Sequence, residues 1–224
     1  APRRARSGLT PPRPAAPAGH RAPPPAPTPA PRLCESLGHE VEEATAAYRP
    51  GDVAAASAVV MNSNLVAQID ARLEQLGRPL ADDDLEPFTR VIYDTYRALT
   101  ATDVSRALGR MQEIGWAVGS AFTTYDVLLS PTLARPTPLL GTLDTGRPES
   151  IYEHASVYSA FTSVHNVTGM PAMSVPLGWD GDGLPLGVQF ATDLGGEGLL
   201  LSLAAQLEQA APWAATRVQE GPLT

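Results

Sequence analysis

The sequence predicts an α/β fold built as one domain. The chain has 224 residues and a hydrophobic content of 43%, enough for a globular domain with its own core. Apolar residues recur at helical spacing in some stretches, and form short runs bounded by Gly, Pro and Asp in others. Helices interleaved with short strands typically pack around a sheet.

Residues 1–32 differ in composition from the rest. They hold eleven of the 23 prolines, six of the 16 basic residues and no acid, with Leu9 as the only large aliphatic side chain. So little apolar surface cannot offset the entropy of ordering, and we expect a disordered Pro/Arg-rich arm. Two interpretations stay open: a partner-binding arm, or a frameshift or mis-called start in GC-rich DNA.

The elements up to residue 99 follow from periodicity and stop signals. A helix ends at Gly38, and a short strand is predicted over 39–45. Two helices are predicted next, over 53–77 and 84–99. The apolar stripe expected on the first of these comprises Val60, Leu65, Ile69, Leu73 and Leu76.

A third helix is predicted to begin at Thr102, whose hydroxyl suits an N-cap. Its apolar face would carry Val104, Leu108, Met111, Ile114 and Val118. A buried strand over 125–131 and a long proline-rich loop over 131–148 come after it.

The remaining elements are a helix, a hairpin and a final helix. The helix is predicted over 150–165, and strands over 172–177 and 185–192 flank the connection "GWDGDG". The final helix covers 196–210, and Trp213 is expected to pack beside it.

Several motif-like stretches leave a metal or cofactor site incomplete. "HEVEE" has Glu43 where the zinc motif HExxH needs its second histidine. "DGDG" at 180–183 starts like an EF-hand loop, but Leu184 occupies the third ligand position, so we expect a polar hairpin turn. No P-loop, GxGxxG, CxxC or GxSxG motif is present, and we expect no metal and no cofactor.

Charge and cysteine content bound the partners and the compartment. All 16 basic residues are arginine, which stays protonated and cannot replace a lysine base. Beyond residue 32, ten arginines stand against 24 acids, which argues against nucleic acid as a partner. No apolar run approaches the roughly 18 residues of a membrane span. The single cysteine, Cys34, cannot form an internal disulfide, and we expect a cytoplasmic location.

Cys34 and two histidines leave an independent hydrolase as an alternative. Cys34 lies near His39 in sequence, and His154 and His165 lie eleven residues apart on one predicted helix. A buried structural cysteine and packed or capping histidines are the competing interpretation.

Four segments, in chain order, resemble the amidase signature family of hydrolases. They are "LCESLGHEVEEA", "YDVLLSPTLARPTPLLG", "FTSVHNVTGMPAMSVPLG…DGLPLGVQF" and "LLLSLAAQLEQAAPW", and the resemblance covers roughly residues 33–224. The third segment carries the most matching positions: Thr162, Asn166, Gly169, Pro171, Ala172, Pro176, Gly183, Leu184, Pro185, Gly187 and Gln189.

The resemblance implies the carboxy-terminal part of an α/β/α sandwich around a mixed sheet, and metal-free hydrolysis of a carbon–nitrogen amide bond. The family uses a serine nucleophile, a second serine in a cis peptide, a lysine base and a Gly/Ser-rich loop that stabilises the oxyanion. This sequence has no lysine and no Ser-Ser dipeptide. The chain therefore resembles a truncated amidase that is inactive alone, and no catalytic residue is assigned.

The resemblance places five residues beside the substrate pocket: Pro131, Thr132, Asn166, Gly169 and Pro171. The expected partner is a small-molecule amide substrate of the full-length parent. Part of a sandwich exposes apolar faces and sheet edges, so self-association is also expected. The alternative is a non-enzymatic α/β remnant or an interaction module with a proline-rich arm.

Overall fold

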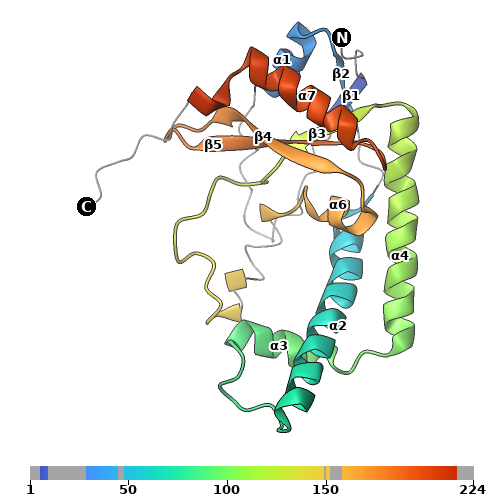
Figure 1. Cartoon of the computed structure of the whole chain (residues 1–224), viewed down its shortest axis with the longest axis vertical. Coiled ribbons are helices and arrows are strands. Elements are labelled where there is room, and N and C mark those ends of the chain that lie inside the picture. Colours follow the sequence, from blue (N-terminus) through green and yellow to red (C-terminus); the bar gives the residue numbers. More distant parts are fainter. Residues whose placement is uncertain (1–5, 10–28, 45–47, 149, 152–157, 216–224) are drawn as a thin grey trace, which may run out of the picture.

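The computed structural model describes residues 6–9, 29–44, 48–148, 150–151 and 158–215. Figure 1 shows α1 and α7 together over one face of a sheet, with α6 on the other side and the long α2 and α4 extending away from it. This arrangement confirms the predicted α/β class with helices on both sides of a sheet.

The sheet has five strands in the described residues: β1 (Arg6–Leu9), β2 (Glu40–Glu43), β3 (Val127–Pro131), β4 (Ala172–Trp179) and β5 (Pro185–Ala191). Their order is β2-β1-β3-β5-β4. β1 pairs in parallel with β2 and β3, whereas β5 pairs antiparallel with β3 and β4. The sheet is therefore mixed, as the resemblance implied.

Strand β1 differs from the disorder predicted for residues 1–32. All four of its residues pair with β2, and residues 7–9 also pair with β3. A strand between two neighbours is held by its backbone hydrogen bonds, which do not require large side chains. Residues 1–5 and 10–28, which make up most of the expected arm, lie outside the described residues.

The helices agree in kind with most of the predicted elements. They are α1 (Ala30–Ser36), α2 (Pro50–Leu76), α3 (Pro87–Tyr96), α4 (Ala101–Gly119), α6 (Ser163–Thr168) and α7 (Glu197–Ala210), with short 3₁₀ turns at Ser120–Thr123 and Trp213–Ala215. Helix α1 begins inside the segment 1–32, and Ala30 is fully buried. The folded part of the chain thus starts before residue 33.

Two helix predictions are wrong in detail. Thr100, not Thr102, caps α4: its hydroxyl accepts the Asp103 N–H at 3.2 Å, and the Asp103 carboxylate accepts the Thr100 N–H at 2.9 Å. This reciprocal capping box satisfies two backbone donors at once. The helix predicted over 150–165 is interrupted by a turn at 159–162, and His154 lies outside the described residues.

Two hydrophobic clusters form the core. One lies between α1, α7 and the sheet, and its largest fully buried side chains include Phe190, Leu129 and Leu207, with Trp213 packed against it as expected. The other joins α2, α4 and α6 through Val53, Ala56, Ile114, Val118, Val164, Val167 and Met170. The stripe predicted on α2 is only partly covered: Leu76 is exposed and its other four residues are half-buried. The buried residues of this helix are Val53, Ala56 and Val66.

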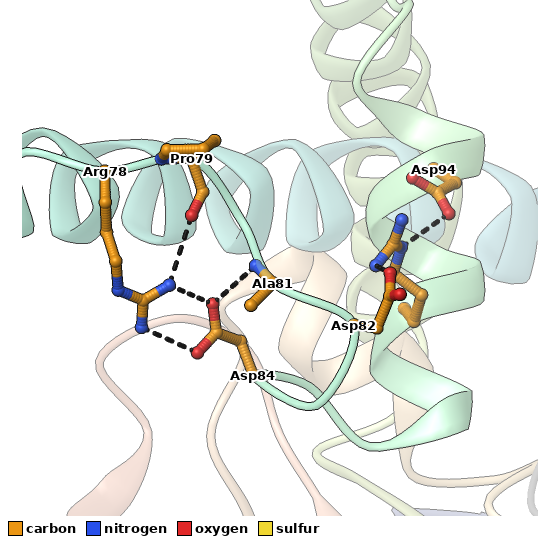
Figure 2. Close-up of polar contacts among 7 residues, drawn as sticks. Arg78, Pro79, Ala81, Asp82, Asp84 and Asp94 are labelled. Carbon is orange, nitrogen blue, oxygen red and sulfur yellow. Dashed lines mark hydrogen bonds and ion pairs between the residues drawn. The ribbon is translucent and has the colours of Figure 1, made fainter.

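Charged pairs fix the connection between α2 and α3, drawn in Figure 2. Arg78 binds both carboxylate oxygens of Asp84, at 2.6 and 2.8 Å, and the Ala81 N–H donates to Asp84 at 2.8 Å. These hydrogen bonds hold the pKa of the Asp84 carboxyl well below its usual range. The loop is thus ordered by local contacts, at the end of α2 far from the sheet (Figure 1).

Candidate functional site

The sheet face away from α1 and α7 carries small and polar side chains. Along β3 and β5, the core residues Val127, Leu129, Val188 and Phe190 alternate with residues that point to this face. We call it the polar face and define it by Ser130, Thr132, Ser174, Gly187 and Gln189. Ser174 is exposed, and Ala172 beside it on β4 is exposed as well.

Thr132 and Ser174 meet on the polar face although their strands are not neighbours. Their hydroxyl oxygens lie 2.6 Å apart. β5 runs between β3 and β4, and adjacent strands are about 4.8 Å apart, so the two backbones are about 10 Å from each other. The contact crosses β5 over Gly187, where a Cβ atom would lie 2.8 Å from each hydroxyl oxygen.

Gln189 ties the polar face to the segment before α6. Its side chain is buried, and Nε2 donates to the Phe161 carbonyl at 3.1 Å and to Ser130 Oγ at 3.3 Å. A buried amide with two partners costs little to bury. Gln189 therefore connects β3, β5 and the chain entering α6.

The five residues expected at the pocket form two groups. Pro131 and Thr132 lie where β3 ends, and the Thr132 N–H donates to the Gly187 carbonyl at 3.0 Å. The other three lie around the α6–β4 turn, at the opposite end of β5, where the Pro171 carbonyl accepts the Thr192 N–H at 3.1 Å. Five residues of strand separate Gly187 from Thr192, about 16 Å. The two groups therefore lie at opposite ends of β5.

Within the second group, Gly169 has a clear structural role. It is the left-handed residue that ends α6, with φ 71°, a conformation that glycine adopts without strain. Asn166 lies on the exposed side of the same helix. A pocket role for these residues stays a prediction.

The comparison with known proteins assigns the family. The family model described as Amidase matches residues 30–201. The chain belongs to the amidase family. This match begins inside the segment 1–32, in agreement with the start of α1.

Known amidases are much longer than this chain. It is 34% identical over 192 residues to the putative amidase AmiC of Mycobacterium leprae (strain TN), an alignment covering 85% of this chain and 40% of that protein. It is 35% identical over 198 residues to the 6-aminohexanoate-cyclic-dimer hydrolase of Paenarthrobacter ureafaciens, covering 82% of this chain and 39% of that protein. The chain thus spans about 40% of the length of these amidases.

Solved amidase structures share the fold. A 6-aminohexanoate cyclic dimer hydrolase superposes with a TM-score of 0.74 at 30% identity, covering 85% of this chain and 41% of the other. A bacterial aryl acylamidase of the amidase signature family superposes with a TM-score of 0.70 at 22% identity, which supports the fold alone.

Sequence reasoning did not select Ser130, Ser174, Gly187 or Gln189 as site residues of this amidase chain. A signal was present, because a glycine inside a strand marks a close approach of neighbouring groups. In the segment that became β5, the polar Gln189 also lies between the apolar Val188 and Phe190. Which of these residues meet depends on the strand order, which the pattern does not contain.

The environments of the candidate nucleophile and base do not favour an independent hydrolase. Cys34 is 1% exposed in the core, and burial raises the pKa of its thiol to about 11, so the reactive thiolate is scarce at neutral pH. His39 Nε2 lies 3.0 Å from the Gln206 side-chain oxygen. Burial lowers the pKa of His165 to about 4, and its Nδ1 makes no hydrogen bond within the described part of the chain.

Two hollows lie beside helices in the described part of the chain. One, of about 500 Å³, is lined by Tyr48 and Arg49 and by Arg110, which binds Asp52 at 2.7 Å and Glu113 at 2.6 Å. The other, of about 730 Å³, is mostly apolar and is lined by α4, α6 and the loop after β5. Neither hollow is lined by the five residues that the resemblance places at the substrate pocket: Pro131, Thr132, Asn166, Gly169 and Pro171.

Over the described ranges, no three His, Cys, Asp or Glu side chains are grouped so that they could hold a metal ion. No helix in this part of the chain combines the length and apolar character of a membrane span.

Proposed function

We propose that this chain is part of an amidase that hydrolyses carbon–nitrogen amide bonds, and that it forms a wall of the substrate site but does not supply the catalytic groups. The observation that carries the proposal is the family match over residues 30–201. Hydrolase relatives of more than twice its length at 34–35% identity support it.

The chain lacks the groups that would start the reaction. Acyl transfer through a serine needs a base that removes its proton, and an arginine side chain stays protonated. The sequence contains no lysine and no Ser-Ser dipeptide. We therefore expect the isolated chain to be inactive, and the rest of the amidase to supply the nucleophile and the base.

The polar face is the part of the wall best suited to hold an amide. The Thr132 and Ser174 hydroxyls share one hydrogen bond at 2.6 Å. Each hydroxyl has one donor and two acceptor positions, so the pair keeps capacity for an amide N–H or C=O. Pro131 shapes the same end of β3, whereas Asn166, Gly169 and Pro171 would border the site from the α6–β4 turn.

The proposal also covers the substrate, the cellular location of the protein and the self-association of the isolated chain. The substrate is a small-molecule amide, and the single cysteine fits a reducing cytoplasm. The isolated chain would self-associate because it leaves sheet surface open.

A chimera tests the proposed function. This chain replaces the matched part of the Paenarthrobacter ureafaciens 6-aminohexanoate-cyclic-dimer hydrolase, and hydrolysis of the cyclic dimer and of an aryl amide is measured. The chimera is expected to turn over one of these amides. Thr132→Ala with Ser174→Ala is expected to lower its kcat/KM by about tenfold or more, the value of one to two lost hydrogen bonds.

The matched control is Thr95→Ala on α3. Thr95 bonds only its own helix, at Val91, so the chimera should keep its kcat/KM. A folded chimera with no turnover would contradict the amidase assignment, and an unchanged kcat/KM in the double variant would contradict the role of the polar face.

A further inference from the structure

Arg135 lies on the segment that follows β3, and burial rather than a polar partner holds its side chain. The residue is partly buried, and its Nε atom is buried but makes no hydrogen bond within the described part of the chain. Its two Nη atoms are not buried in this way, and no described residue binds them. The side chain therefore presents the outer, two-pronged end of its guanidinium group to the surroundings.

The backbone around Arg135 is fixed next to the polar face. The Thr132 N–H donates to a carbonyl of β5 at 3.0 Å, and the Ala134 N–H donates to the Tyr158 carbonyl at 3.3 Å. Ala134 is buried, and Pro136 restricts the backbone conformations open to Arg135. Three residues of chain span at most about 11 Å, so the Arg135 backbone lies within that distance of Thr132.

Several arginines of the described chain are paired with acids, in contrast to Arg135. Arg147, on the same loop, binds Asp144 at 2.9 Å, and Arg78 and Arg110 each bind a carboxylate at 2.6 Å. No acid among the described residues binds Arg135. A charged donor that is partly withdrawn from water without a partner costs free energy, and an anion that reaches it offsets this cost. The open end of Arg135 is therefore suited to an anion that comes from outside the described residues.

We propose that Arg135 binds a carboxylate of the amide substrate, so that the site selects amides that also carry a negative charge. The two Nη atoms of a guanidinium group match the two oxygens of a carboxylate. Because Arg135 lies close to the Thr132–Ser174 pair that would hold the amide, a carboxylate separated from the amide by a short carbon chain would reach it. This inference rests on the proposed function, and it adds the chemical class of the substrate.

Three anilides of similar size test the selectivity in the chimera. Pentananilide is uncharged, glutaric acid monoanilide carries a carboxylate on the acyl side, and para-(pentanoylamino)benzoate carries one on the amine side. We expect kcat/KM for one of the charged anilides to exceed that for pentananilide by about tenfold or more, the effect of one charge-assisted hydrogen bond. In Arg135→Gln, the ratio of charged to uncharged kcat/KM should fall to about 1, because the variant has no cation to meet the carboxylate.

The matched control is Arg72→Gln on α2, which also removes one positive charge. Arg72 is exposed and binds Gln75 at 3.2 Å, near the end of α2 that lies far from the sheet. This variant should keep the ratio of charged to uncharged kcat/KM. A ratio that falls equally in both variants would show that the total charge of the protein, and not Arg135, sets the preference.

Two further outcomes in the chimera overturn the inference. One is equal kcat/KM for the charged and uncharged anilides. The other is an Arg135→Gln variant that loses stability and turns over all three anilides more slowly by the same factor, because an acid of the amidase polypeptide then pairs with Arg135.

A binding measurement on the 224-residue chain decides if the chimera turns over no anilide or Arg135→Gln does not fold. The NMR signal of the Arg135 Nε–H group is followed while glutaric acid monoanilide or para-(pentanoylamino)benzoate is added. A saturable shift that pentananilide does not cause supports the inference, and the absence of a shift with both charged anilides overturns it. Loss of all turnover in a folded chimera counts against the proposed function, so the two failures are distinguishable.

Discussion

The hydroxyl oxygens of Thr132 and Ser174 lie 2.6 Å apart across an intervening strand. The strand between them, β5, has Gly187 at the crossing point. Because glycine has no side chain, two residues from β3 and β4 can meet above it. This contact builds the polar face, and its stability depends on the glycine.

Gly187→Ala should destabilise the protein by about 1–3 kcal/mol, the usual cost of overpacking. The new Cβ would lie 2.8 Å from both the Thr132 and the Ser174 hydroxyl oxygens. Denaturant-induced unfolding measures the free energy. The cost should fall when Thr132→Ala and Ser174→Ala are also present, because both oxygens are then absent.

Gly109→Ala in α4 is the matched control for Gly187→Ala. Its Cβ would meet nothing within 4 Å, and alanine is the better helix former by about 1 kcal/mol. The variant is expected to be as stable as the unsubstituted protein or more so. Equal effects at the two glycines would contradict the steric account.

Thr100→Ala should cost about 1 kcal/mol of stability, because it removes one half of the capping box at the start of α4. Thr102→Ala, two residues later and inside the helix, should change stability by less than about 0.5 kcal/mol. Thermal or denaturant unfolding of the two variants compares them. A larger loss of stability in Thr102→Ala than in Thr100→Ala would show that Thr100 is not the residue that caps α4.

His165 should make stability fall as the pH is lowered. Its folded pKa is about 4 and its ordinary value is 6.5, so the unfolded chain binds the additional proton between these values. Stability attributable to neutral His165 is complete above pH 6.5 and is lost towards pH 4, by about 3 kcal/mol from the difference in pKa.

The measurement for His165 is the free energy of unfolding from pH 7 to pH 4. Carboxyl groups also titrate in this range, so the relevant quantity is the difference between the unsubstituted protein and His165→Gln. The variant should have the shallower pH dependence. Parallel curves would show that His165 keeps an ordinary pKa in the folded chain.

Cys34 should resist alkylation in the native state. It is 1% exposed, and burial raises its thiol pKa to about 11. Iodoacetamide at pH 8 should modify it only as fast as the protein unfolds, and denaturant should make it react completely. Modification of the native protein at the rate of a free thiol would support the alternative in which Cys34 is the nucleophile of an independent hydrolase.

Local sequence patterns predicted the helices and the β4–β5 hairpin well. At 180–184 the turn forms as expected, with the Asp180 carboxylate accepting the N–H groups of Asp182 and Leu184. The stop predicted at Gly38 also formed, since α1 ends at Ser36 and Gly38 adopts the left-handed conformation with φ 88°. These features depend on residues close together in the chain.

Features that depend on strand order were not predicted. β1 was read as part of a disordered arm because its composition is poor in apolar residues, yet β2 and β3 supply its hydrogen bonds. The Thr132–Ser174 contact joins residues 42 positions apart, and the sequence does not state which strand lies between them. The turn at 159–162, which precedes α6, was not predicted either.

The rate of amide hydrolysis by the isolated chain, compared with that of the chimera, tests the central claim most directly. We expect the isolated chain to release amine from an aryl amide no faster than buffer, while the chimera hydrolyses an amide substrate. Turnover by the purified isolated chain, proportional to its concentration, would contradict the claim that the catalytic groups lie elsewhere in the amidase.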